Sequence, residues 1–345
     1  MDAIGDYILF RNFLEEIATS AKYSSYELTL VGNEIWKPIA EKLDTKWIDA
    51  FIWIKPKKFQ KDFSYRKEKV KELRKYKYSI LFHPSFSRDY YIAESIASFI
   101  NAKEKISVQG DEINLSSWQK KKSDKQYNTL LKNPTGIHFE YSKNKGLLSE
   151  FLDENLDTRY SISLNESRHT RIIEEEYIIL FIGGSADFKK WSDENWQQLI
   201  EKILTTFPYT IVLAGGPDDL ESGQEIKKNF AKENRLINLC AKTSLLELIS
   251  LISYAEWMVS NETSAPHIAA ALGVPVLVLS NANHYARFLP YPKTIFDKHY
   301  SVFSKEVEKE KNEDILIQKY GEGSDLSIQS IYVEDVFDRI VKNFS

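Results

Sequence analysis

The sequence has little of what disulfide, metal and redox sites need. Its 345 residues include a single cysteine, Cys240, so it has neither a disulfide framework nor a cysteine-based metal site. The six histidines show no pair at the helical spacing of zinc ligands. P-loop, dinucleotide-fingerprint and nucleophile-elbow motifs are also absent. We therefore expect no metal site, and one cysteine in 345 residues suits a reducing, cytoplasmic compartment.

Long hydrophobic runs and an excess of positive charge are also missing. No apolar run approaches the ~20 residues that cross a bilayer as a helix. The net charge of −4 gives no bulk attraction to nucleic acid, and we expect no nucleic-acid partner. Hydrophobic residues make up 43% of the chain, which is enough for the cores of two domains.

Alternating apolar and amphipathic segments predict an α/β fold in two domains. Expected strands are residues 27–31, 48–54, 78–82, 176–182, 209–214, 236–240, 257–259 and 274–279. Expected helices include residues 7–20, 35–43, 88–101, 193–206, 219–231 and a closing helix at 333–343. This alternation is typical of parallel sheets covered by helices on both faces. We place the domains at residues 1–165 and 166–345.

Three expected strand ends in the second half carry polar or glycine-rich loops, at residues 183–191, 215–221 and 260–267. Ligands of parallel sheets bind beyond the carboxyl ends of the strands. The loop at 260–267 also leads into a small-residue helix, whose N-terminus favours an anion. We interpret this edge as a site for the phosphates and sugar of a nucleotide. The alternative is an ordinary, well-capped turn between strand and helix.

Four segments in this half carry a family resemblance when taken in order. They are residues 181–196 (FIGGSADFKKWSDENW), 212–217 (VLAGGP), 241–248 (AKTSLLEL) and 260–270 (SNETSAPHIAA). Together they resemble glycosyltransferase family 9, the heptosyltransferase-like enzymes of lipopolysaccharide core assembly. The resemblance implies the GT-B fold, in which two Rossmann-like domains face each other across a cleft. It also allows the last helix to pack back on the first domain.

The same resemblance implies an activity. The family pattern is an inverting, metal-independent glycosyltransferase that moves a sugar from a nucleotide-diphosphate donor to a lipopolysaccharide or related glycan acceptor. Heptose is the sugar that the family suggests, with ADP-heptose as co-substrate and no cofactor. Such an enzyme is cytoplasmic and can contact the inner face of the cytoplasmic membrane peripherally.

Site residues follow from motif position. The catalytic base implied by the family's I-G-D loop is Asp6, which can alternatively be a helix cap. Donor-binding candidates are Gly183, Gly184, Lys189, Asp219, Glu221, Glu262, Thr263, Ser264 and His267. Acceptor-side candidates, by position only, are His83 and Arg88. A solvated loop lysine is the alternative for Lys189, and a packed core residue is the alternative for His267.

Departures from the family pattern leave other functions open. Ser264 stands where the family has glycine, Glu262 where it has aspartate, and residues 279–282 (LSNA) replace F-G-P-T. A non-catalytic descendant that binds nucleotide sugars is one alternative, and a GT-B-type nucleotide-sugar epimerase is another. The I-G-D loop also follows a β-strand in the family, and we expect the first sheet to lack that strand here.

A basic stretch at residues 55–77 contains eleven Lys or Arg against three acids, interleaved with aromatic residues. It can contact anionic lipid headgroups or a phosphorylated acceptor glycan. The alternative is a solvated helix face.

Overall fold

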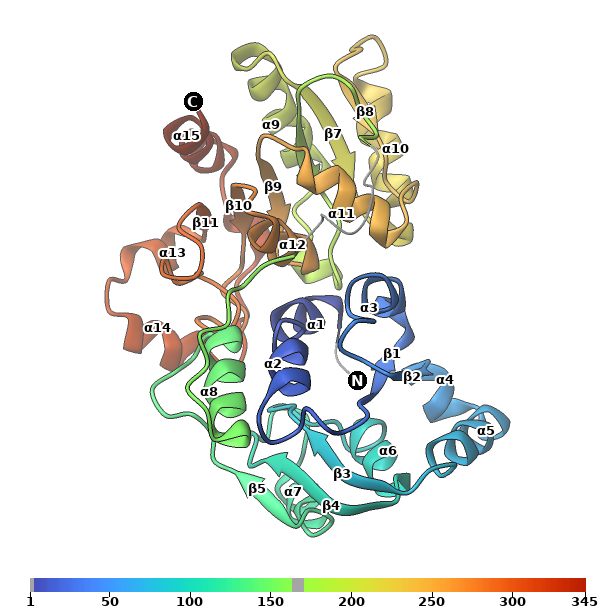
Figure 1. The fold of residues 1–345 in the computed structure, drawn as a ribbon. Coiled ribbons are helices and arrows are strands. Elements are labelled where there is room, and N and C mark those ends of the chain that lie inside the picture. Colours follow the sequence, from blue (N-terminus) through green and yellow to red (C-terminus); the bar gives the residue numbers. More distant parts are fainter. Residues whose placement is uncertain (1–2, 163–170) are drawn as a thin grey trace. The chain divides into compact units, whose positions relative to one another are not determined.

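The computed structural model describes residues 3–162 and 171–345. The chain divides into two compact units, Met1–Arg159 and Tyr160–Ser345, here called the N-terminal and C-terminal units (Figure 1). The predicted boundary between residues 165 and 166 lies outside the described residues. The Tyr160 hydroxyl donates a hydrogen bond to the His267 backbone oxygen, and the Ile162 backbone N–H donates to that of Ala271, so both residues belong to the C-terminal unit. Among the helices of the described residues, none is both long and apolar enough to span a bilayer.

The N-terminal unit is built from two small parallel sheets and eight described helices. Its strands are β1 (Thr29–Asn33), β2 (Ala50–Ile54), β3 (Tyr78–His83), β4 (Ala102–Val108) and β5 (Thr129–Leu131). Its helices are α1 (Ile4–Phe10), α2 (Phe13–Thr19), α3 (Lys37–Leu43), α4 (Pro56–Lys61), α5 (Phe63–Leu73), α6 (Ala93–Phe99), α7 (Ser117–Asp124) and α8 (Glu140–Leu152). The expected single helix at 7–20 is therefore two helices.

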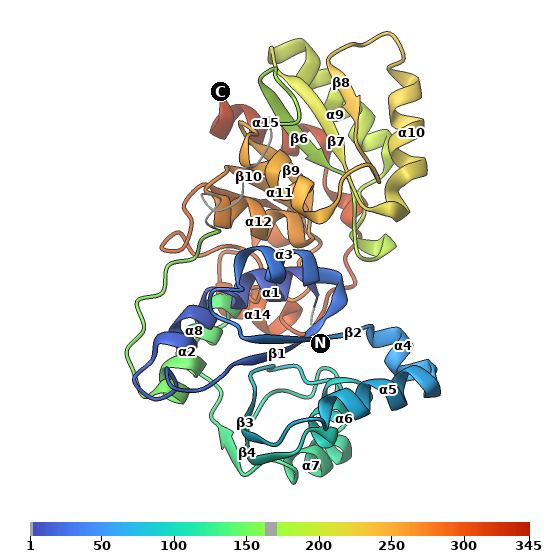
Figure 2. The ribbon, with the colours of Figure 1, turned by 45° about the vertical axis from the view of Figure 1, so that its right-hand side comes forward.

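The two sheets of this unit are β1-β2 and β3-β4-β5, and Figure 2 shows them as separate ribbons. They share one hydrophobic cluster, to which Ile52 and Ile54 of β2 and Leu81 of β3 contribute. Within the described residues, β1 and β3 each pair with one strand only. Both are only partly buried, unlike the central strands of the C-terminal unit. The expected strand ahead of the I-G-D loop stays a prediction.

The C-terminal unit contains one parallel sheet of six strands, in the order β11-β10-β9-β6-β7-β8. The strands are β6 (Tyr177–Phe181), β7 (Thr210–Ala214), β8 (Leu236–Asn238), β9 (Met258–Asn261), β10 (Val276–Leu279) and β11 (His299–Val302). The helices are α9 (Asp193–Thr206), α10 (Leu220–Asn229), α11 (Leu245–Ser253), α12 (Ser264–Leu272), α13 (Lys305–Lys309), α14 (Glu313–Tyr320) and α15 (Val333–Phe344). Strands β6 and β7 are buried along their whole length, as expected for continuous apolar runs covered on both faces.

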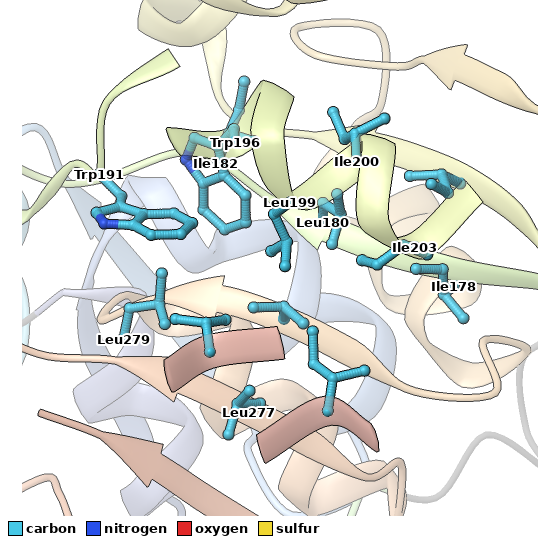
Figure 3. Packing of buried hydrophobic residues seen from close by; sticks show 14 of the residues in the cluster. Ile178, Leu180, Ile182, Trp191, Trp196, Leu199, Ile200, Ile203, Leu277 and Leu279 are labelled. Carbon is cyan, nitrogen blue, oxygen red and sulfur yellow. The ribbon is translucent and has the colours of Figure 1, made fainter. Parts of the chain in front are cut away.

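Helix α9 shows how the sequence determines this packing. Its N-cap Ser192 accepts a hydrogen bond from the Asn195 backbone N–H at 3.2 Å. Apolar residues then recur at the spacing of one helix face, and all are buried against the sheet: Trp196, Leu199, Ile200 and Ile203. Figure 3 shows these side chains beside those of β6 and β10. The same cluster includes Val336 and Ile340 of α15, which contacts α9 and β11. The closing helix is thus part of the core of its own unit.

We predict that Ile340→Ala lowers the free energy of unfolding of the C-terminal unit by about 2–5 kcal/mol. Ile340 is fully buried, so the substitution removes apolar contacts and leaves a cavity. The matched change Val341→Ala affects a neighbouring side chain that is 38% exposed, and should cost less than about 0.5 kcal/mol. Urea unfolding followed by circular dichroism measures both. Equal effects of the two variants would contradict the packing of α15.

Candidate functional site

Four neighbouring strands of the C-terminal unit end in line. Phe181 of β6 pairs with Ser260 of β9 and with Ala214 of β7, while Leu279 of β10 pairs with Asn261. The loops after these strands therefore meet at one edge of the sheet, as expected for carboxyl ends in a parallel sheet. This strand-end edge contains all of the predicted donor-binding residues except Glu221 and His267, which lie farther along the helices that follow.

A lysine and a carboxylate from different loops pair at this edge. The Lys189 ammonium donates to Glu262 Oε1 at 3.1 Å. The Ser280 hydroxyl, directly after β10, donates to the other oxygen of Glu262. Both members of the ion pair are largely shielded from solvent, at 15% and 7% side-chain exposure. Lys189 is therefore held in a defined position rather than solvated, although its role toward a ligand stays a prediction.

A second lysine–carboxylate pair lies beside the first. Lys190 Nζ is 2.7 Å from Asp219 Oδ1, and Asp219 Oδ2 accepts a hydrogen bond from the Gly216 backbone N–H. Two glycines make room for this buried carboxylate. A Cβ on Gly183 would lie 2.5 Å from Asp219 Oδ2, and one on Gly215 would lie 2.8 Å from Asp219 Cβ.

Asn261 fixes the loop that carries both lysines. Its side chain is fully buried and its amide nitrogen donates to the backbone oxygens of Ile182 and Gly183. Its amide oxygen accepts from the Trp191 backbone N–H at 3.2 Å. One side chain on β9 thus binds the loop at both ends, which limits where Lys189 can lie.

The N-terminus of α12 is partly open to solvent at this edge. Thr263 is its N-cap, and its hydroxyl accepts from the Ala265 backbone N–H at 3.2 Å. Ser264 is the first helical residue, and both side chains are half-buried. The helix terminus provides a partial positive charge next to the Lys189–Glu262 pair. Ser264 lies in ordinary helical backbone, so a serine fits where the family has glycine.

His267 is packed inside the unit. It is only 6% exposed, and its Nδ1 lies 2.5 Å from the Tyr291 hydroxyl. Burial and, to a smaller extent, the charge of Lys189 together lower the pKa of its imidazole to about 3. The ring is therefore neutral near pH 7. This placement is the packed-core alternative, and contact with a ligand stays a prediction.

The remaining donor candidates differ in accessibility. Glu221 is exposed in the first turn of α10, where its carboxylate is available to a ligand. Asp219 is only 5% exposed and engaged by Lys190. Gly184 lies against the Lys190 side chain, since a Cβ there would be 2.7 Å from Lys190 Cγ.

In the N-terminal unit, Asp6 lies in the first turn of α1 and is half-buried. Its carboxylate accepts from the Ala3 backbone N–H at 3.0 Å, which is the capping contact named as the alternative role. The helix itself is firmly held. The next residue, Tyr7, stacks on Trp36 at 4.0 Å and donates to Asp44 at 2.6 Å.

The acceptor-side candidates His83 and Arg88 belong to a buried polar cluster of the same unit. The Arg88 side chain is fully buried, binds Asp124 and lies 3.3 Å from Glu94. His83 Nδ1 is 2.8 Å from the Tyr127 hydroxyl, which also donates to Glu94. Burial is the main reason that the pKa of Glu94 is raised, although Arg88 opposes the shift. The buried Arg88 guanidinium holds Glu94 and Asp124 together in this structure, and contact of His83 or Arg88 with an acceptor stays a prediction.

Three residues of the edge were not among the predicted site residues: Lys190, Asn261 and Ser280. Lys190 follows Lys189 directly in the loop, and it pairs with Asp219. Asn261 is the last residue of β9, and Ser280 directly follows β10. A polar residue at the end of an apolar strand was the sequence signal that could have identified both. In the described part of the chain, no three His, Cys, Asp or Glu side chains are grouped as metal ligands.

Comparisons with known proteins find relatives of one family. The family model of glycosyltransferase family 9 (heptosyltransferase) matches residues 86–316. Lipooligosaccharide heptosyltransferase 2 of Haemophilus influenzae is 33% identical over 117 residues, covering 32% of this chain and 33% of that protein. Lipopolysaccharide heptosyltransferase 3 of Escherichia coli is 28% identical over 125 residues, covering 36% of each chain. The chain thus spans about a third of the length of these curated relatives.

Solved structures show the fold over the whole chain. The structure of E. coli heptosyltransferase WaaC with ADP has a TM-score of 0.73 at 15% identity, covering 99% of this chain and 98% of that one. This likeness confirms the predicted GT-B class of fold, with its parallel sheets and many helices.

We predict that the His267 imidazole does not protonate between about pH 8 and pH 5, because its pKa is about 3 instead of the usual 6.5. The unfolded chain binds this proton near pH 6.5, so the histidine makes folding less favourable as the pH falls from about 6.5 toward 3. Its ring signals in ¹H–¹³C spectra, assigned by their loss in His267→Gln, should not shift in that window. A titration midpoint above pH 5 would contradict the packed, neutral ring.

Proposed function

Because the chain belongs to glycosyltransferase family 9, we propose that it transfers a sugar from a nucleoside diphosphate donor to a lipopolysaccharide or related glycan acceptor. Heptose is the proposed sugar and ADP-heptose the proposed donor. The observation that carries this proposal is the strand-end edge of the C-terminal unit. There, two lysines and the N-terminus of α12 converge from adjacent loops.

The donor diphosphate lies, in this proposal, between Lys189 and the first turn of α12. The Lys189 ammonium has three protons and can contact phosphate oxygens while it keeps its bond to Glu262. The partial positive charge at Thr263 and Ser264 adds to this stabilisation. These fixed charges stabilise the departing diphosphate as negative charge builds up on it, so we propose that the transfer needs no metal ion.

The sugar and ribose contacts come from carboxylates of the same edge. Glu262 is held by Lys189 and Ser280 in one orientation, which suits recognition of sugar hydroxyls. Exposed Glu221 is the better candidate for the ribose, since Asp219 is already engaged by Lys190. Gly183 and Gly184 let the backbone of their loop pass close to this site.

Asp6 is the proposed general base. Its carboxylate would take the proton from the acceptor hydroxyl as that oxygen attacks the anomeric carbon. The bond from that carbon to the diphosphate breaks on the opposite face, so the configuration inverts. The fixed position of α1, through Tyr7 and Trp36, gives the carboxylate a defined direction.

The acceptor is proposed to be anionic, because the basic stretch at 55–77 forms α4 and α5 with most of its lysines exposed. The Phe63 side chain at the start of α5 is 78% exposed among them. Phosphates of a glycan or glycolipid acceptor would contact this surface. The protein would then act in the cytoplasm, at the inner face of the membrane that holds the glycolipid.

We predict that Lys189→Ala weakens ADP binding by about 10- to 100-fold, since a hydrogen bond to a charged group contributes about 1.5–3 kcal/mol. A thermal-shift screen of ADP, UDP, GDP and dTDP first identifies the base. The correct nucleotide at 100 times its dissociation constant should stabilise the fold by about 2.7 kcal/mol. Calorimetric titration then compares the variant with Lys202→Ala, which removes a half-buried lysine of α9 that pairs with Glu334, away from the strand-end edge. Unchanged affinity in Lys189→Ala would place the phosphates elsewhere.

We predict that Asp6→Asn leaves donor binding unchanged and slows transfer by at least about 100-fold. Asparagine keeps a side-chain oxygen that can accept from Ala3 N–H, so the variant retains the helix cap and loses only the base. Transfer of labelled sugar to an acceptor measures the rate, and calorimetry measures donor affinity. Full activity in Asp6→Asn would show that Asp6 caps the helix and is not the base. Donor binding without transfer in the unaltered protein would instead identify a non-catalytic descendant.

A further inference from the structure

The N-terminal unit carries a second group of aromatic and basic side chains, most of them exposed, outside the basic stretch at 55–77. We name it the α7 face, and it consists of Tyr90, Tyr91, Trp118, Lys121, Lys122 and Lys125. Helix α7 and the segment between β3 and α6 contribute these residues (Figure 1). None of them has a part in the function proposed above.

Helical spacing puts one tryptophan and three lysines on the same side. Lys121, Lys122 and Lys125 follow Trp118 by three, four and seven residues, which is one face of a helix and its C-terminal cap. The other side of α7 faces the protein: Ser123 is buried, and Asp124 binds Arg88 and Lys120. The helix is therefore divided into a packed side and a basic, aromatic side.

The aromatic rings of the α7 face support one another while remaining open to solvent. The Tyr90 ring lies edge-to-face with Trp118 at 5.6 Å and with Tyr91 at 5.3 Å. Tyr91 and Trp118 are nevertheless 58% and 60% exposed. Exposing large rings to water is unfavourable, and such contiguous patches usually mark a binding surface. The Lys122 ammonium lies 5.8 Å from the Tyr90 ring centre, so charge and ring are directly adjacent.

Nearby acids do not neutralise the lysines. Glu112 accepts from the Ser117 hydroxyl at 2.6 Å, and Asp89 accepts from the Ile92 backbone N–H at 2.6 Å. Asp124 is engaged on the packed side of the helix. Across residues 3–162 and 171–345, no carboxylate lies within 4.0 Å of the ammonium groups of Lys121, Lys122 or Lys125. Among the described residues, the three lysines of the α7 face therefore form no ion pair.

We propose that the α7 face docks on a bilayer surface of anionic phospholipids. Tryptophan and tyrosine are favoured at the level of lipid headgroups, where the ring is buried and its polar edge stays wet. Lysines beside them contact the phosphates, and each contributes attraction to an anionic surface. An exposed helix face suits a flat bilayer. The docking proposal rests on the proposed function in one respect: a glycolipid acceptor would lie in the same membrane.

The test is co-sedimentation of the full chain with vesicles of phosphatidylglycerol and phosphatidylcholine, which contain neither donor nor acceptor. We expect binding to these vesicles and little to phosphatidylcholine alone. Lys121→Gln/Lys122→Gln should lower the partition coefficient by about 30-fold, and Lys121→Arg/Lys122→Arg should restore it. Trp118→Ala should lower it by about tenfold or more, with Trp118→Phe in between. These side chains are exposed or only partly buried, so melting curves should stay unchanged.

The matched control is Lys228→Gln/Lys232→Gln, which removes the same two charges from exposed positions in and after α10 of the C-terminal unit. It should bind vesicles as the unaltered protein does. The proposal is overturned if the control loses as much binding as the α7 variant, if the α7 variant binds normally, or if the unaltered protein does not bind. Because no transfer is measured, a failure here leaves the proposed glycosyltransferase function untouched. Loss of transfer in solution would, conversely, leave the docking result intact.

Discussion

The shared strand register of β10, β9, β6 and β7 is the constraint on which the candidate site depends. It brings Ser280, Glu262, Lys189 and Asp219 to one edge, although Lys189 and Ser280 are about ninety residues apart in the chain. Pairing also solves an electrostatic problem, because a lysine and a carboxylate that are mostly shielded from water are each costly alone. The same contacts that position the cation therefore keep this edge folded. A ligand phosphate would add to an arrangement that already exists instead of ordering a flexible loop.

The two units achieve rigidity in different ways. The C-terminal unit relies on a continuous sheet whose inner strands are wholly buried, with α9 and α15 closing one cluster. The N-terminal unit has two separate sheets, and a buried polar contact helps to hold its helices together. Arg11 binds Asp44 at 2.6 Å and Tyr7 donates to the same carboxylate, which joins α1 to the end of α3. Asp6, one residue before Tyr7, is thereby held without help from a sheet edge.

The sequence predicted the C-terminal unit well because its signals are local. Continuous apolar runs mark β6 and β7, and Ser192 and Ser244, residues of a type that favours N-caps, cap α9 and α11. Strands β4 and β5 and helix α14 were not predicted, because their segments are mixed in polarity and become regular only through tertiary contacts. Side-chain partners were the least predictable feature. Nothing local distinguishes the buried Arg88 from an exposed arginine, or Lys190 from a solvated lysine, until the elements that supply Glu94, Asp124 and Asp219 are in place.

Two departures from the family pattern are in direct contact, which changes how they should be interpreted. Glu262 replaces an aspartate and is one methylene longer, while Ser280 occupies a position where the family has glycine. In the fold the Ser280 hydroxyl donates to the Glu262 carboxylate, whose other oxygen accepts from Lys189. A glycine at 280 would offer no such donor, and the longer side chain spans the distance between β9 and its neighbours on both sides. In this fold the two changed residues are therefore in contact, and Ser280 helps to hold the Glu262 carboxylate beside the lysine.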